Sequence, residues 1–235
     1  MSKSLMKKKN LISHVLLEHS NECIHLEFTQ ELKVLSSAVY NGGLVSAHHL
    51  LNLKVPLSIN CHEKPESSLQ NYADSASWHG CVVGMMTAAS MKSFAMQTQT
   101  VQEIEIAVLV TSGLSNARCV GDKAEYRHML SDVKEVGTIN IIILTSATLS
   151  EAAMAEILMI VTEAKVLVMY ELGINSTTSG KIATGTGTDS VAVVSGVDTE
   201  PIRYAGKHTL FGELLGKMVI STLKTSIDEK IEYKF

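Results

Sequence analysis

One stretch of the sequence combines glycines, hydroxyl side chains and an acid. Residues 181–190 read Lys-Ile-Ala-Thr-Gly-Thr-Gly-Thr-Asp-Ser and precede the apolar run Val191–Val194. Glycine lets the main chain come close to a ligand, and hydroxyl groups can bind that ligand or attack it. A strand after the loop would hold it in place, so the pattern predicts a catalytic or binding loop. The alternative is a strand-entry loop whose threonines only cap backbone groups.

The loop does not match the common nucleotide-binding sequences. No Gly-Lys-Ser/Thr closes it, as a P-loop requires, and Ser190 stands where a dinucleotide fingerprint has its third glycine. A nucleotide- or phosphate-binding enzyme is therefore disfavoured.

A second group of reactive side chains precedes a final helix, which is expected at about Leu210–Lys224. Lys207, His208 and Thr209 lie at or before its N-terminus. Free amides and the positive end of the helix dipole favour an anion there and keep a nearby imidazole neutral. We therefore expect His208 to act as an acid/base partner of Asp189.

Glu213 lies in the first turn of the same helix and has two possible roles. It could help Asp189 to activate a water molecule. It is also four residues before Lys217, in the favourable order for a solvent-exposed ion pair.

A long helix is expected to start at Thr148-Leu-Ser-Glu151, which reads as a capping box, and to end at Gly173. It is apolar nearly all round, which predicts burial on two sides. Glu163 and Lys165 lie about 200° apart around its axis, so they cannot pair with each other. One of these charges must therefore find a partner on another element, either as a structural ion pair or at the site.

Several strands are expected before residue 145. Period-2 alternation over Cys23–Phe28 and Leu32–Val39 predicts a hairpin, and Ile104–Thr111 and Gly137–Leu144 are β-branched runs. Asn140 lies within the last run and needs partners for both of its amide groups. It therefore either ties down a neighbouring loop or faces a ligand.

Composition limits the class of protein. The chain has 235 residues, 46% of them hydrophobic, with a net charge of −4. We expect a soluble, cytoplasmic protein without nucleic-acid or membrane partners. Residues 1–20 are expected to form a tail and residues 21–235 a single catalytic domain. The apolar C-terminal helix and the 11 methionines are compatible with a homodimer.

The cysteines and histidines give no metal signature. The four cysteines form no Cys-x-x-Cys pair, which favours reduced thiols. His48 and His49 are adjacent and so point in different directions, and His208 and Glu213 lack the spacing of a zinc helix. No metal site is predicted.

The order of these elements predicts the fold class. Strands come early, and two long helices follow without regular alternation. We expect a single α+β domain, with a mixed or mainly antiparallel sheet flanked by the two long C-terminal helices.

Eight different short motifs follow one another along the chain between about Ser36 and Ser226. They are Val83-Gly-Met-Met-Thr-Ala-Ala89, Thr111-Ser-Gly-Leu-Ser-Asn-Ala117, Gly121-Asp122, Gly137-Thr-Ile-Asn-Ile-Ile142, Thr162-Glu-Ala-Lys165, Ala183-Thr-Gly-Thr-Gly-Thr-Asp-Ser190, Tyr204-Ala-Gly-Lys-His-Thr209 and Gly212-Glu213. As a series they resemble the adenosylcobinamide amidohydrolase family of cobamide salvage. The first 35 residues carry little of the resemblance, and Ser112 departs from the alanine of the family pattern.

The resemblance implies a hydrolase that cuts the amide joining the corrinoid's propionyl side chain to aminopropanol, giving adenosylcobyric acid. The corrinoid is then the substrate, and no cofactor is expected. No Asp-x-His-x-x-Gly sequence is present to bind its cobalt. A corrinoid-binding or sensing protein without catalysis is the main alternative.

The candidate site residues fall into two groups. Those expected to be catalytic are Asp189, His208, Thr188 and Glu213. Those expected to bind the substrate are Thr184, Gly185, Thr186, Gly187, Ser190, Lys207, Thr209, Asn116, Asn140, Lys165 and Glu163. The sequence leaves open whether a threonine or serine of the loop or an activated water attacks the amide.

Overall fold

The computed structural model describes residues 8–55, 64–124, 137–198 and 200–231. Its helices are α1 (Pro65–Ser75), α2 (Glu151–Glu171) and α3 (Leu210–Ile231), with a short 3-10 helix η1 (Met91–Ser93). Its strands are β1 (Lys9–Ile12), β2 (Val15–His19), β3 (Cys23–Ser36), β4 (Gly43–Lys54), β5 (Val82–Thr87), β6 (Ala95–Val101), β7 (Ile104–Ser112), β8 (Ala117–Arg118), β9 (Ile139–Thr145), β10 (Gly185–Thr186) and β11 (Ser190–Ser195).

Nine of the strands form one mixed sheet. Its order is β1-β2-β3-β11-β9-β7-β6, and β4 joins β3 to β5. The β4–β5 and β9–β11 pairs are parallel, and the other pairs of the sheet are antiparallel. The prediction of an α+β domain with a mainly antiparallel sheet is confirmed.

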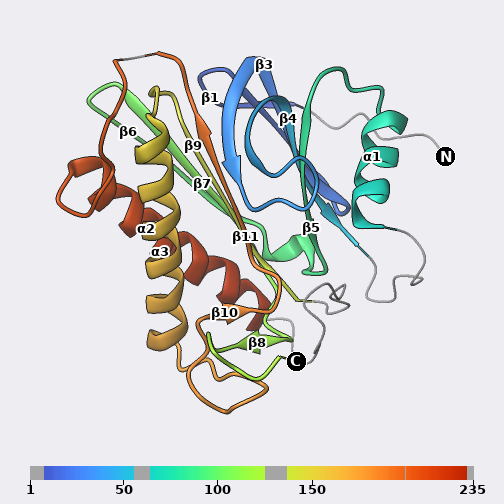
Figure 1. Ribbon diagram of the computed structural model, residues 1–235, viewed down its shortest axis with the longest axis vertical. Helices are drawn as coiled ribbons and strands as arrows, with labels where there is room; N and C mark the ends of the chain where they lie inside the picture. Colours follow the sequence, from blue (N-terminus) through green and yellow to red (C-terminus); the bar gives the residue numbers. More distant parts are fainter. Residues whose placement is uncertain (1–7, 56–63, 125–136, 199, 232–235) are drawn as a thin grey trace.

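The sheet is covered by helices and also packs against itself (Figure 1). On β7, β9 and β11, one set of alternate side chains, including Ile141, belongs to the apolar cluster of α2 and α3. The other set, including Ile142, packs with side chains of β1–β5 such as Leu50. Helix α1 covers Leu51 of β4 through Leu69. The chain is thus layered as helices, strands, strands and helix, with two buried faces on the central strands.

The N-terminal residues correct one prediction. Residues 9–19, expected to lie in a tail, form β1 and β2, which extend the sheet beyond β3. Ile12, Val15 and Leu17 are buried there. The apolar pattern of residues 11–17 is short and follows three lysines at positions 7–9, and burial of its apolar side chains outweighs that charge.

The predicted hairpin within residues 23–39 is also wrong. Cys23–Ser36 is one strand, and its pairing with β4 shifts register between Glu27 and Leu32. The polar residues 29–31 therefore mark a bulge rather than a turn, because a bulge accommodates extra residues without ending the strand.

Helix α2 lies where the sequence predicts it, but the predicted burial on two sides is wrong. It begins after Ser150, whose hydroxyl accepts a hydrogen bond from the Ala153 N–H, and it ends before Gly173, which has φ of 62°. Its outer side, however, exposes Met159 and Tyr170. The helix is thus buried on one side only. Within the described ranges, no helix has the length and apolar character needed to cross a membrane.

A buried histidine pair should make the fold sensitive to acid. His25 Nε2 and His49 Nδ1 are 3.1 Å apart, and both rings stack on Trp78. Burial lowers the pKa of both imidazoles from its ordinary value of 6.5, although Glu18 opposes this effect at His25. Below pH 6.5 the unfolded chain therefore binds more protons than the folded one, so the free energy of unfolding should fall as the pH decreases.

Urea unfolding between neutral and mildly acidic pH measures this effect. His208→Gln serves as the control, because it replaces an exposed histidine that lies outside the buried pair. A free energy of unfolding that stays level or rises on acidification below pH 6.5 would show that the buried pair does not control acid stability.

Candidate active site

Three strand ends bring the conspicuous sequence pieces together. Strand β9 pairs with β7 in the antiparallel direction and with β11 in the parallel direction. The end of β7 therefore lies on the same side of the sheet as the beginnings of β9 and β11. Nearby, β8 pairs with β10, with Ala117 opposite Thr186. The glycine-threonine loop therefore contacts β8, which follows β7, and the residues Gly137 and Thr138 just before β9.

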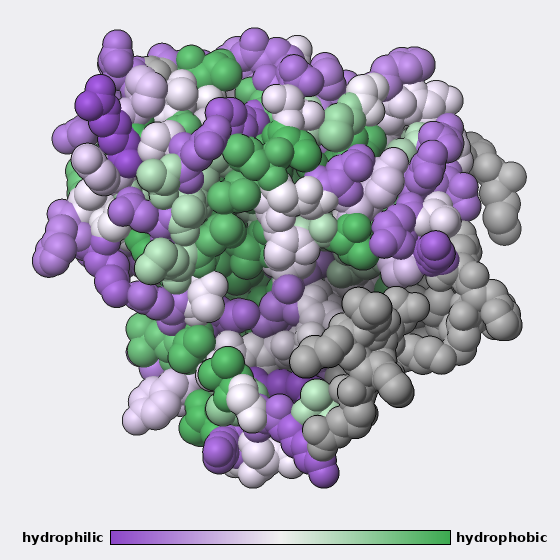
Figure 2. All heavy atoms as spheres, in the orientation of Figure 1, coloured by the Kyte–Doolittle hydropathy of each residue, from purple (hydrophilic) through white to green (hydrophobic). Residues whose placement is uncertain are grey.

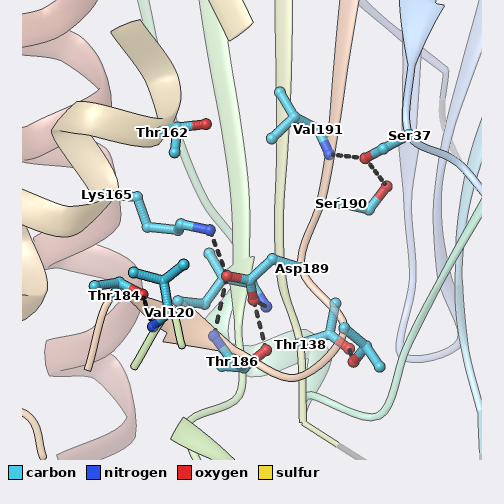
Figure 3. A network of polar contacts seen from close by, with 12 residues as sticks. Ser37, Val120, Thr138, Thr162, Lys165, Thr184, Thr186, Asp189, Ser190 and Val191 are labelled. Carbon is cyan, nitrogen blue, oxygen red and sulfur yellow. Dashed lines mark hydrogen bonds and ion pairs between the residues drawn. The ribbon is translucent and has the colours of Figure 1, made fainter. Parts of the chain in front are cut away.

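Asp189 is the centre of this arrangement (Figure 3). Its Oδ2 is 2.5 Å from Lys165 Nζ on α2 and accepts a hydrogen bond from the Thr186 N–H at 3.0 Å. Its Oδ1 accepts hydrogen bonds from Thr186 Oγ1 at 2.5 Å and from the Ile139 N–H at 3.0 Å. Four donors thus fix both the position and the orientation of the carboxylate.

The centre is largely shielded from water. The side chains of Lys165 and Asp189 are each 11% exposed. At such burial the attraction between opposite charges is stronger than at a surface, and loss of either partner leaves an uncompensated charge.

Gly185 is required by this packing. A Cβ atom at position 185 would lie 2.1 Å from Asp189 Oδ2 and 2.8 Å from Lys165 Nζ. These distances are too short for any side chain, so the glycine lets the ion pair lie directly against the main chain.

The other hydroxyl groups of the loop have neutral partners. Thr188 Oγ1 lies 2.8 Å from both Gly137 O and Thr138 Oγ1, and Thr184 Oγ1 accepts a hydrogen bond from the Val120 N–H. Ser190 Oγ lies 3.3 Å from the Ser37 hydroxyl. Among the described hydroxyl groups of residues 184–190, the one that contacts a carboxylate is thus that of Thr186. Gly187 is exposed.

The two predicted asparagines differ in their contacts. Asn140 Nδ2 donates hydrogen bonds to Asn52 Oδ1 and Met86 O, so this side chain ties β9 to the strands β4 and β5 rather than to a loop, and its Oδ1 has no hydrogen-bond partner among the described residues. Asn116 is 8% exposed, and neither atom of its amide has a hydrogen-bond partner among the described residues. It lies against Gly137, where a Cβ would be 2.1 Å from Asn116 Oδ1.

The expected hydrogen bond between Asp189 and His208 is not formed. Lys165, Thr186 and Ile139 bind the carboxylate instead, and His208 is exposed just before α3. No hydrogen bond of His208 is found within the described ranges. Sequence spacing indicated the helix end correctly, but it carries no information on which way that end faces.

The remaining charged candidates form ion pairs at the surface. Lys207 Nζ is 2.6 Å from Glu163 Oε2, and Lys217 Nζ is 2.5 Å from Glu213 Oε1. Glu213 therefore adopts the solvent-exposed pair that its spacing favours. Thr209 Oγ1 accepts a hydrogen bond from the Gly212 N–H at the start of α3.

Glu163 and Lys165 thus find separate partners on other elements, as their positions on the helix require. The Lys165–Asp189 pair itself was not predicted. The sequence feature that could have predicted this pair is the isolated charge of Lys165 on an apolar helix, because such a charge needs an acidic partner on another element.

An apolar surface adjoins the centre. Figure 2 shows hydrophobic side chains gathered beside α2, over the position of β11 in Figure 1. Leu158, Val191 and Leu35 are half-buried, and Leu44, opposite Leu35 in the sheet, is 43% exposed. Because Asp189 comes just before β11, a large apolar ligand on this surface would lie close to the carboxylate.

In the residues that the structure describes, no group of three or more histidine, cysteine, aspartate or glutamate side chains could hold a metal ion. The described cysteines, Cys23, Cys81 and Cys119, are free thiols, and Cys61 lies outside the described residues.

Known proteins are similar to this chain in sequence and, more distantly, in structure. The uncharacterized protein MJ1613 of Methanocaldococcus jannaschii is 31% identical over 216 residues, which are 83% of this chain and 81% of that protein. The adenosylcobinamide amidohydrolase of Methanosarcina mazei is 29% identical over 197 residues, 80% of this chain and 86% of that protein.

Two solved structures are also similar. The PH0078 protein of Pyrococcus horikoshii has a TM-score of 0.46 at 12% identity, covering 96% of this chain and 89% of its own. A Burkholderia β-aminopeptidase has a TM-score of 0.43 at 10% identity, covering 89% and 78%.

A family model gives the most extensive match. The model described as adenosylcobinamide amidohydrolase matches residues 5–234, which is nearly the whole chain. The chain therefore belongs to the adenosylcobinamide amidohydrolase family.

Proposed function

We propose that the protein hydrolyses adenosylcobinamide. The bond cut is the amide between the propionyl side chain of the corrin ring and aminopropanol, and the product is adenosylcobyric acid for cobamide salvage in the cytoplasm. Family membership and the named relative of Methanosarcina mazei support this reaction. The observation that carries it is the shielded Asp189 carboxylate, which holds a hydroxyl on one oxygen and an ammonium group on the other.

Amide hydrolysis needs an attacking oxygen, a base and donors for the oxyanion. Asp189 Oδ1 is placed to take a proton from Thr186 Oγ1, or from a water that occupies the same position. The ammonium group of Lys165 lies 2.5 Å from this carboxylate, and its positive charge favours the negative charge that develops on the substrate's carbonyl oxygen. Asp189 is thus the base and Lys165 the electrostatic partner.

The apolar surface beside α2 suits the rest of the substrate. A corrin ring is a large, mostly apolar macrocycle, and Leu35, Leu44 and Val191 offer apolar area next to the loop. An arm of the ring that carries the amide could then extend toward Asp189. In this arrangement most of the binding energy comes from a surface that is distinct from the reacting groups.

The alternative is a corrinoid-binding protein without catalysis. It is favoured by the same ion pair, because a buried Lys–Asp pair with every oxygen hydrogen-bonded can be purely structural. In that case the apolar surface would bind the corrinoid and leave its amide intact.

The two functions predict different products. Purified protein incubated with adenosylcobinamide, without ATP, should release adenosylcobyric acid and aminopropanol, both detected by mass spectrometry. Binding of the corrinoid in a thermal-shift assay with no product over a range of pH and divalent metals would establish the binding protein instead.

A further inference from the structure

The proposed function leaves open which oxygen attacks the amide, and the loop offers four hydroxyl groups. We propose that Thr186 is the nucleophile and that the reaction passes through an ester on its Oγ1. This inference rests on the proposed function and concerns the same site.

The contacts of the four hydroxyl groups separate them. Thr186 Oγ1 is 2.5 Å from Asp189 Oδ1, whereas the hydroxyls of Thr184, Thr188 and Ser190 contact backbone groups or other hydroxyls in the described part of the structure. A hydroxyl is a weak nucleophile unless a base lies within hydrogen-bond reach to accept its proton. Thr186 meets this condition through direct contact.

Asp189 is itself oriented by further groups. Lys165 Nζ and the Thr186 N–H bind its Oδ2, and the Ile139 N–H binds its Oδ1 beside the threonine hydroxyl. The order hydroxyl, carboxylate, ammonium repeats the general plan of a nucleophile, a base and a group that orients the base. The fixed orientation lowers the reorganisation needed when the proton moves.

The position of Thr186 suits attack on a bulky substrate. It is half-buried, and Gly187, which follows it, is exposed and has no side chain to block an approaching amide. Thr186 Oγ1 also lies 3.1 Å from Gly137 O. Two acceptors, Asp189 Oδ1 and Gly137 O, thus hold the position of the hydroxyl.

The chemical steps balance without another reactant besides water. Thr186 Oγ1 bonds to the amide carbon while its proton passes to Asp189 Oδ1. The carbon–nitrogen bond then breaks, and the same proton goes to the leaving aminopropanol nitrogen. The oxygen of a water molecule next bonds to the ester carbon while one of its protons passes to Asp189. The bond between this carbon and Thr186 Oγ1 then breaks, the proton passes from Asp189 to Oγ1, and adenosylcobyric acid leaves.

Variants of Thr186 and trapping of the ester test this assignment together. Thr186→Val, of nearly equal volume, should lower turnover by at least roughly 10³-fold. Thr186→Ser should keep substantial turnover, because it retains the hydroxyl. Thr178→Val, an exposed threonine in the preceding loop, is the matched control and should keep both turnover and melting temperature.

Hydroxylamine separates a nucleophile from a positioning residue. With the wild type, added hydroxylamine should divert product from the acid to the hydroxamate, and acid-quenched protein should carry the corrinoid acyl group on the peptide containing residue 186. If wild-type protein turns over but forms no hydroxamate, or if Thr186→Val keeps turnover, water attacks directly and the assignment is wrong. Absence of any wild-type product would overturn the proposed function and this inference with it.

Discussion

Replacing Asp189 by asparagine should lower the turnover of adenosylcobinamide by about 10²–10⁴-fold, the usual contribution of a general base. Asparagine keeps the shape of the side chain and can still accept the hydrogen bond of the Ile139 N–H, but its amide cannot take the proton of Thr186. The binding of the corrinoid should change little, because the apolar surface beside α2 is untouched. Steady-state rates and corrinoid titrations of wild type and variant measure the two effects separately.

A comparison with His208→Ala sharpens this test. The imidazole is exposed and has no contact with Asp189 in the described structure, so its loss should have a much smaller effect on turnover. If Asp189→Asn kept near-normal rates while His208→Ala lost activity, the chemistry would depend on the start of α3, and the carboxylate would be structural.

Replacing Lys165 by methionine should have the largest effect on stability. It leaves the Asp189 carboxylate 11% exposed and without its counter-charge, which typically costs about 3–5 kcal/mol for a buried pair. The loop should loosen as well, because Gly185 packs directly against the pair. Urea unfolding of wild type and Lys165→Met measures the loss.

Two further variants control for the loss of charge alone. Lys217→Met removes a surface partner of Glu213 and should cost at most about 1 kcal/mol. The double variant Lys165→Met/Asp189→Asn should be more stable than Lys165→Met, because it removes the unpaired charge. A Lys165→Met protein as stable as Lys217→Met would show that the buried pair contributes little to the fold.

Local sequence patterns were sufficient for several elements. The capping residues and apolar run of α2 predicted its position closely, and the β-branched runs predicted β7 and β9. The glycine-threonine loop was also recognised as leading into a strand, since β11 starts at Ser190. Each of these features depends on neighbouring residues in the chain, which a sequence shows directly.

The errors arise where distant segments decide the outcome. Whether residues 29–31 form a turn or a bulge depends on the length of β4, which pairs on both sides of them. Whether the outer side of α2 is covered depends on which elements pack there. Both questions are tertiary, and no local pattern answers them.

The site shows the same division. Spacing on the helix showed that Lys165 could not pair with Glu163, and composition of the loop pointed to Asp189. The contact between Lys165 and Asp189 needs α2 to lie across the start of β11, and this arrangement follows from the packing of the apolar cluster. The predicted pairing of Asp189 with His208 was wrong because it rested on local sequence features alone, and no packing of distant elements brings these two residues together.

We propose that Asp189 serves hydrolysis of the corrinoid amide. A single-turnover reaction of adenosylcobinamide in ¹⁸O-labelled water, with wild type and Asp189→Asn side by side, tests this role. We expect wild type to give adenosylcobyric acid carrying one ¹⁸O atom together with aminopropanol, and the variant to bind the corrinoid but leave it intact on the same timescale. Intact adenosylcobinamide with both proteins, or equal amounts of acid from both, would show that Asp189 has no part in this hydrolysis.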